Sequence, residues 1–295
     1  MATRNASPPP AAGGGTGLSW LLLPALVLVL AVMVAPMALL FRYSLNLYSP
    51  TDLMVAAMTP ANYVAAVADP YYRNILATTL RMAFLCTVLA LAAGFPAAYV
   101  LARMGGRWKS WLTLLTVFPL MVGNVVRAAG WMALLGNTGV VNAALKAIGI
   151  GALPLMYTPG TVVVGIVTVV LPYMILTLAA VIEGIPRSVE EAALNLGARP
   201  FTVFRRVVLP LALPGVVAGS ALVFILCMNA YATPVLLGGA QFKMMAPAVY
   251  DQFVRTTNWP FGGALAFILL AVTLGLTLAG TALLQRRGRG APAPG

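Results

Sequence analysis

Long runs of apolar residues, separated by shorter polar stretches, make up most of this chain. Six of these runs reach the roughly 20 residues that an α-helix needs to cross the hydrocarbon of a bilayer. Each run is expected to be helical because lipid offers no hydrogen-bond partner to backbone groups. The pattern therefore predicts an all-α polytopic membrane protein with six transmembrane helices, at residues 20–41, 82–101, 111–135, 161–182, 214–237 and 261–284.

The two ends of the chain differ from the rest in composition. The first run follows MATRNASPPPAAGGGTG, whose Pro, Gly and Ala residues bury too little surface to fold. We expect a disordered tail at residues 1–17, a transmembrane domain at 18–285 and a basic tail at 286–295. A cleaved signal peptide has an apolar region of only about 7–15 residues. Because the first run is longer, we interpret it as a retained span.

The charges predict how the chain is oriented. Only 8% of the residues are charged, the net charge is +12 and the mean hydropathy is +0.94. These values exclude a soluble domain, in which about a quarter of the residues are charged. In a soluble protein the positive charge would suggest nucleic acid, but in membrane proteins Lys and Arg gather on the cytoplasmic side. Both termini are therefore expected in the cytoplasm, on the side that holds Arg4, Arg103, Arg107, Lys109, Arg187, Arg199, Arg205, Arg206, Arg286, Arg287 and Arg289.

Several kinds of chemistry are excluded by the residues that are missing. The chain contains no His and only two Cys, which removes the usual zinc ligands, the commonest general base and any disulfide framework. Cys86 and Cys227 lie in apolar runs and are expected to be small buried hydrophobes. The segment GGRWKS has glycines and a lysine, but not at the spacing of a P-loop. We expect no catalytic residue, no metal and no cofactor on this chain.

One polar segment, SVEEAALNLGARPFTVFRRVVLPLALPG, begins at Ser188 and stands between two spans. Ser188 and Glu191 fit a capping box, which predicts a helix that begins at Val189. Glu190 and Glu191 then lie in its first turn, where the positive end of the helix dipole favours acids. Helical spacing gives this helix one narrow apolar stripe, made of Val189, Ala193 and Leu196.

The end of this helix is marked by Gly197 and Pro200, and a second short helix is expected at residues 201–208, up to Pro210. Small residues and paired acids suit close docking against another protein's backbone. An amphipathic connector on the membrane surface would instead favour large apolar residues and a lysine-rich polar face. We favour docking and keep the connector as the alternative.

The same segment resembles the Glu-Ala-Ala loop of ABC-importer permeases, a coupling element of two short helices that sits in a cleft of a separate ATP-hydrolysing subunit. The motif matches Glu191, Ala192, Ala193, Gly197, Leu209 and Pro210. The resemblance implies a coupling loop at 183–213, with ATPase coupling assigned to Glu190, Glu191, Ala192, Ala193, Leu196, Gly197, Leu209 and Pro210.

Three further stretches, DPYYRNILATTLRMAFL, MYTPGTVVVGIVTVVLPYMILTL and NWPFGGALA, are similar to permeases of spermidine/putrescine importers and follow the same order. The resemblance implies the type I ABC importer permease fold in a bacterial inner membrane. Its implied partners are a second, different permease chain, two ATPase subunits that bind ATP and magnesium, and an extracytoplasmic solute-binding protein. The loops at 43–73, 136–160 and 238–260 would receive that binding protein.

Polar residues inside the spans are candidates for the translocation pathway: Asn124, Arg127, Asn229 and Tyr231. Arg127 is costly in lipid and should face protein or water. A hydrogen bond to helix ends, or a side chain that reaches the outer surface, are the structural alternatives. Pro234 is expected to break the fifth span near its outer end, and the G-x-x-x-G pair Gly215 and Gly219 indicates close helix packing.

The solute remains open between two classes. The resemblance implies a polyamine such as spermidine or putrescine, but no acid lies inside a span to bind a multiply charged cation. An anionic or zwitterionic solute, such as an opine or a phosphonate, is the alternative. An ion-coupled secondary transporter would usually have titratable acids in its spans, and a membrane-embedded enzyme would need a nucleophile or metal cluster. We therefore rank both functions below that of a permease subunit.

Overall fold

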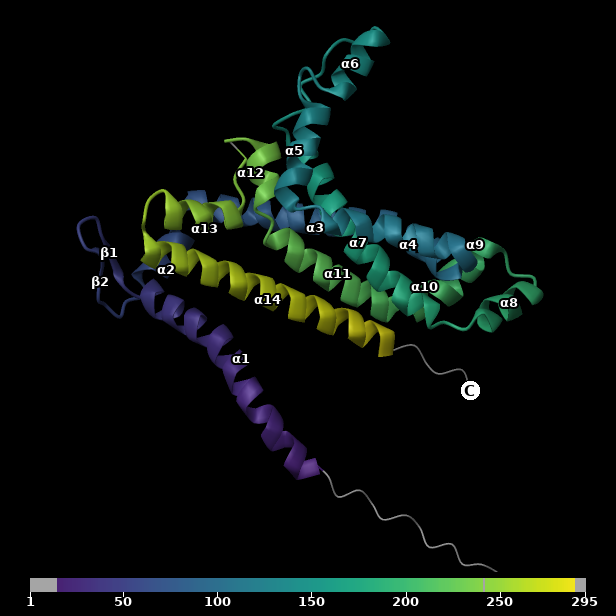
Figure 1. Ribbon diagram of the computed structural model, residues 1–295, viewed down its shortest axis with the longest axis horizontal. Helices are drawn as coiled ribbons and strands as arrows, with labels where there is room; N and C mark the ends of the chain where they lie inside the picture. The colour runs from purple at the N-terminus through teal and green to yellow at the C-terminus, as the bar shows by residue number, and fades with distance from the viewer. Residues whose placement is uncertain (1–14, 241, 290–295) are drawn as a thin grey trace, which may run out of the picture.

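The computed structural model describes residues 15–240 and 242–289 and is mostly helical (Figure 1). The all-α prediction is confirmed apart from one short antiparallel hairpin, in which Leu47 pairs with Val55. The elements are α1 (Gly15–Ser44), β1 (Leu47–Ser49), β2 (Leu53–Val55), α2 (Ala61–Ala68), α3 (Pro70–Arg103), α4 (Gly106–Met121), α5 (Asn124–Leu135), α6 (Val140–Ala147), α7 (Pro159–Glu183), α8 (Arg187–Asn195), α9 (Pro200–Val203), a π-helical turn (Phe204–Val208), α10 (Leu209–Leu211), α11 (Leu213–Met228), α12 (Ala232–Gly238), α13 (Met245–Val254) and α14 (Trp259–Arg289).

The predicted tails lie largely outside the described residues. Of the tail predicted at 1–17, residues 1–14 are outside the description, and α1 begins at Gly15. Of the tail predicted at 286–295, residues 290–295 are outside it, and α14 ends at Arg289.

Four helices are each long and apolar enough to cross a membrane: Leu26–Ser44 within α1, α3, α7, and Trp259–Ala282 within α14. Two further helix pairs pass the same test only when they are taken together. The axis turns by 96° between α4 and the α5–α6 segment, and by 68° between α9–α10 and α11. The described part of the chain therefore has four continuous spans, or six if each bent pair counts as one.

The runs at 111–135 and 214–237 are each broken into two helices. No break was predicted in the first run, and in the second a break was predicted at Pro234. The first is interrupted at Val122 and Gly123, where the backbone is extended. Pro119, three residues earlier, lacks an N–H, and glycine is a poor helix former, so the ladder of hydrogen bonds is weak here.

The second break lies between α11 and α12, at residues 229–231. The Asn229 side chain donates through Nδ2 to Ile225 O at 2.9 Å and so competes with the backbone for that carbonyl. Pro234 was expected to cause the break, but it lies within the first turn of α12. A proline there costs no helical hydrogen bond.

Small residues let α3, α7 and α11 pack closely in the centre of the bundle. A Cβ added at Gly215 would lie 2.8 Å from Val181 Cβ, and one at Gly219 would lie 2.9 Å from Met174 Sδ. The packing role predicted for this glycine pair is thus confirmed, as expected where helices associate without a hydrophobic driving force. Cys86 and Cys227 are both free and buried, as predicted.

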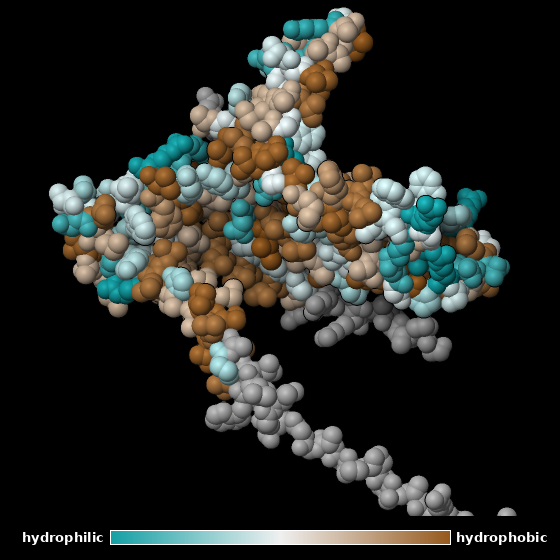
Figure 2. Space-filling view, in the orientation of Figure 1, coloured by the Kyte–Doolittle hydropathy of each residue, from teal (hydrophilic) through white to brown (hydrophobic). Residues whose placement is uncertain are grey.

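The ends of the bundle differ in character. The hairpin, α2 and α13 lie at one end, whereas α8 and α9 lie at the other, and α1 diverges from the body (Figure 1). The surface between them is mainly apolar, and hydrophilic residues gather over the α8–α9 end (Figure 2). This distribution is typical of a protein whose middle faces lipid.

Gly165 on α7 allows close contact with α12. A Cβ added there would lie 2.5 Å from Leu237 Cδ1 and 2.6 Å from Thr233 Cγ2. We expect Gly165→Val to destabilise the protein by about 1–3 kcal/mol through overpacking, seen as a lower melting temperature in detergent. Gly275→Val is the matched control, because no atom lies within 4 Å of a Cβ at that helical glycine. An equal fall in melting temperature in both variants would contradict a role for the contact between Gly165 and α12 in stability.

Candidate functional site

A cavity of about 430 Å³ lies where the two broken helices meet. α12 packs against α5 and α7, so the segments that follow both breaks are brought together. All four residues predicted for the pathway line this cavity, although Asn124 and Arg127 lie more than 100 positions before Asn229 and Tyr231 in the chain. The lining residues are Leu120, Asn124, Val125, Arg127, Ile166, Val169, Val170, Tyr173, Leu226, Asn229, Ala230, Tyr231, Ala232 and Thr233.

Arg127 holds the break between α4 and α5. Its Nη2 donates to Val122 O at 3.0 Å and also to Pro119 O. Both carbonyls belong to the end of α4, where intrahelical partners run out. The hydrogen bond to a helix end, one of the roles considered for Arg127, is thus observed. The side chain is half-buried, and its Nη1 is buried without a partner within the described part of the chain.

The other three candidates lie next to the two helix breaks. Asn124 is the first residue of α5, and Asn229 is the residue at which α11 ends. Tyr231 comes two residues later, immediately before α12, and its ring centroid lies 4.8 Å from that of Tyr250 on α13. Tyr231 is 38% exposed, so it faces an accessible space.

The charge of the cavity is positive. Arg127 is the one charged residue among the described lining residues, and none of them is acidic. Tyr173 and Tyr231 add hydroxyl groups and aromatic faces, which attract ammonium groups. The cavity can therefore bind a polar solute by hydrogen bonds and ring contacts, with an added attraction for negative groups.

The predicted coupling segment forms a helical elbow at one end of the bundle. α8 ends in a Schellman motif, in which Ala198 N donates to Ala193 O at 3.1 Å and Gly197 N donates to Leu194 O at 2.9 Å. Gly197 has φ +84°, a value that glycine adopts without strain. The predicted end of the helix at Gly197 is thus confirmed. The second helix is also confirmed, since residues 200–211 are helical and include Leu209 and Pro210.

The start of α8 differs from the prediction. The helix begins at Arg187, preceded by Pro186 with ψ 131°, and no side chain caps it. Ser188 therefore lies inside the first turn, and the predicted capping box is absent. Only Glu190 is an acid of that first turn. The reason is tertiary, because Arg187 and Glu190 are both bound to the end of α3.

The apolar face of α8 points away from the protein. Leu196 is 89% exposed and Val189 is 41% exposed, while Phe201 on α9 is 72% exposed. Glu191 and Ala192 are exposed, and Ala193 is half-buried. Glu190, by contrast, is buried. A helix with apolar residues outside and an acid inside is the reverse of a soluble surface helix.

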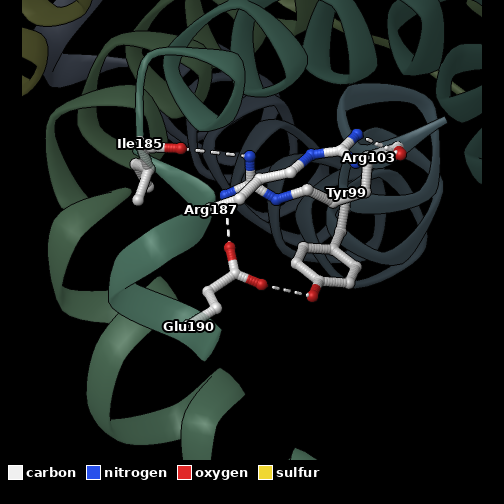
Figure 3. A network of polar contacts seen from close by, with 5 residues as sticks. All are labelled: Tyr99, Arg103, Ile185, Arg187 and Glu190. Atoms are coloured by element: carbon white, nitrogen blue, oxygen red, sulfur yellow. Dashed lines mark hydrogen bonds and ion pairs between the residues drawn. The ribbon is translucent and has the colours of Figure 1, made fainter. Parts of the chain in front are cut away.

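A polar network that was not predicted fixes Glu190 (Figure 3). Its Oε1 forms an ion pair with Arg103 Nη2, and its Oε2 accepts a hydrogen bond from Tyr99 OH at 2.8 Å. Arg103 Nη1 donates to Ile185 O at 3.1 Å, and Arg187 donates to Arg103 O. In the sequence, only one feature pointed to this network: Tyr99 and Arg103 lie one helical turn apart at the end of a predicted span.

No group of three or more Cys, Asp or Glu residues that could hold a metal occurs in residues 15–240 and 242–289. The structure thus offers two sites, the cavity at the breaks and the elbow at the end of the bundle. Neither has an arrangement of nucleophile and base.

Comparisons with known proteins agree with this arrangement. Residues 90–289 match the family of the binding-protein-dependent transport system inner membrane component. The spermidine/putrescine transport system permease protein PotB of Haemophilus influenzae is 31% identical over 274 residues, which is 91% of this chain and 93% of that protein. PotB of Escherichia coli is 33% identical over 71% of this chain and 77% of its own length.

The fold is also found in a solved structure. A chain of the bacterial alginate ABC transporter, in complex with an alginate pentasaccharide-bound periplasmic protein, superposes with a TM-score of 0.73. The two chains are 16% identical, and the match covers 92% of this chain and 94% of that one. Together with the family match over residues 90–289, this similarity shows that the chain belongs to the permease components of binding-protein-dependent ABC importers, which are multi-pass proteins of the inner membrane.

Proposed function

We propose that this chain forms half of the translocation pathway of an ATP-driven importer and couples to a separate ATPase through residues 183–213. It crosses the bacterial inner membrane six times, with each bent helix pair as one crossing, and both termini are cytoplasmic. The observation that supports coupling most directly is the outward apolar face of α8 beside the fixed turn at Gly197. Such a face is suited to a groove on a partner.

A second permease completes the pathway. No residue of α4 is buried, and its outer side presents Trp111 and Phe118, each 67% exposed. This apolar side adjoins the cavity wall that α4 and α5 form. A homologous chain packed there would close the cavity from the other side. The full assembly then contains two permeases, two ATPases that bind ATP and magnesium, and an extracytoplasmic solute-binding protein.

The proposed solute is small and polar. Polyamines such as spermidine or putrescine are the first candidates, because the permeases named PotB are 31% and 33% identical to this chain over the segments that match. Tyr173 and Tyr231 supply ring faces for ammonium groups. An opine or phosphonate is the alternative, supported by Arg127 as the one charge among the described lining residues.

Purification in mild detergent from the native membrane tests the proposal. An ATPase subunit is expected to copurify in stoichiometric amount, and uptake of labelled spermidine into vesicles should require ATP. Competition by unlabelled putrescine, opine or phosphonate identifies the solute class. If uptake continued in complexes that contain no ATPase and followed the proton gradient, the chain would be a secondary transporter.

A further inference from the structure

The two adjacent glutamates of α8 face in opposite directions. Glu191 is exposed, whereas the Glu190 side chain is only 11% exposed and is bound to two residues of α3 (Figure 3). Both were expected to serve the docking of an ATPase. Their opposite orientations indicate two different tasks, because a buried carboxylate cannot contact a subunit that covers the outer face.

Four polar contacts join the end of α3 to the start of α8. Glu190 receives two of them, from Arg103 and from Tyr99 OH at 2.8 Å. Arg103 also donates to Ile185 O at 3.1 Å, and Arg187 donates back to the carbonyl of Arg103. The contacts run in both directions between the two segments. The start of α8 and the last turn of α3 are therefore expected to move as one body.

Burial makes this connection stiff. The Arg103 side chain is 15% exposed, so loss of either partner leaves a charge that is neither solvated nor paired. A second ion pair at this end, Lys109 Nζ to Glu183 Oε1 at 2.9 Å, has side chains that are 36% and 40% exposed. Solvent and salt weaken such a pair. Both pairs join a basic side chain to a glutamate, and the Glu190–Arg103 pair is expected to be the stronger because it is less exposed to solvent.

α3 continues from this network to the helix that lines the cavity. A Cβ at Gly94 on α3 would lie 2.9 Å from Met174 Cγ on α7, so the two helices touch without intervening space. The residue before Met174 on α7, Tyr173, lines the cavity. Rigid helices in close contact pass a displacement from one to the next.

We propose that the Glu190–Arg103 pair, held in register by Tyr99, transmits movement of α8 to α3 and thence to the cavity. Glu190 is then a positioning residue, whereas the ATPase contacts the outer face with Glu191 and Leu196. The inference rests on the proposed coupling to an ATPase. It deepens that function by naming the connection through which ATP hydrolysis reaches the membrane helices.

The test uses the complete complex of both permeases, ATPase and binding protein in proteoliposomes, with ATP hydrolysis and solute uptake measured in the same vesicles. Glu190→Gln and Arg103→Gln should each retain the ATPase and hydrolyse ATP at a rate within about twofold of the unmodified complex. The amount of solute imported per ATP hydrolysed should fall about tenfold, which lies within the roughly 5–150-fold range of typical couplings between sites. The double variant Glu190→Arg with Arg103→Glu should restore most of this ratio, since it re-forms the ion pair.

Lys109→Gln is the matched control, because it removes the half-exposed pair at the same end and should change the ratio by less than about twofold. Loss of the ATPase from Glu190→Gln complexes, with a normal ratio of solute to ATP in those that retain it, would make Glu190 a docking residue and overturn the proposal.

If the Glu190→Gln protein does not accumulate, the Tyr99→Phe variant tests the proposal instead. It removes one hydrogen bond to Glu190 and keeps the ion pair. A fall in its ratio of about twofold or more supports the proposal, and an unchanged ratio overturns it. An unmodified complex that contains no ATPase would refute the proposed function itself.

Discussion

Replacement of Leu196 by aspartate is expected to abolish solute uptake while the protein still inserts into the membrane. Leu196 is 89% exposed, so its side chain contributes little to the fold of this chain. In the assembly it would be covered by the ATPase, and a charge placed there would be desolvated without a partner. Loss of such an interface anchor costs about 2 kcal/mol or more, which weakens binding about 30-fold.

The measurement for Leu196→Asp is copurification of the ATPase, together with uptake into vesicles. Leu196→Met keeps an apolar side chain of similar volume and serves as the control, with near-normal values for both. The melting temperature of the isolated permease should be the same in the two variants. ATPase retention by Leu196→Asp at the unmodified level would show that the outer face of α8 is not the docking surface.

Arg127→Gln is expected to lower both stability and uptake. Arg127 donates to Val122 O and Pro119 O, and it thereby fixes the turn between α4 and α5 that forms one wall of the cavity. A hydrogen bond to a charged group contributes about 1.5–3 kcal/mol, and a shorter neutral side chain cannot reach both carbonyls. We expect a lower melting temperature and uptake reduced at least about tenfold.

Kinetics distinguish the two roles open to Arg127. If it positions the wall, the maximal rate falls and KM for the solute changes little. If it also contacts a negative group of the solute, KM rises for that solute and not for a cationic one. The control is Arg81→Gln, because Arg81 on α3 is exposed and lies outside the cavity lining. A variant at Arg127 with unchanged melting temperature and uptake would refute both roles.

The elements that sequence reasoning found were those specified by local features. α8 ends at Gly197 because the backbone there has a positive φ, which glycine adopts readily. A glycine that follows a helical pattern predicts such an end from the sequence. Gly215 and Gly219 predicted close packing because small residues at that spacing lie on one helix face. These features depend on a few neighbours along the chain, so they can be read without the fold.

The features that were missed or misplaced depend on residues far away in the sequence. The capping box at Ser188 was a correct local pattern, but Glu190 and Arg187 bind the end of α3, and these contacts begin the helix at Arg187. The break at Val122 and Gly123 is a local exception, because Arg127, five residues after Val122, stabilises it through the carbonyls of Val122 and Pro119. Neither outcome follows from helix propensity alone.

Hydrophobic length and local turn chemistry specify a helical membrane protein with six apolar runs and a polar elbow of the Glu-Ala-Ala type, so these features could be read from the sequence. Packing sets where two of the runs break, which glutamate turns inward, and that Asn124, Arg127, Asn229 and Tyr231 line one cavity. These features escape sequence reasoning because a polar group in a nonpolar environment binds whichever partner the packing brings near. For Glu190 that partner lies on another helix, α3.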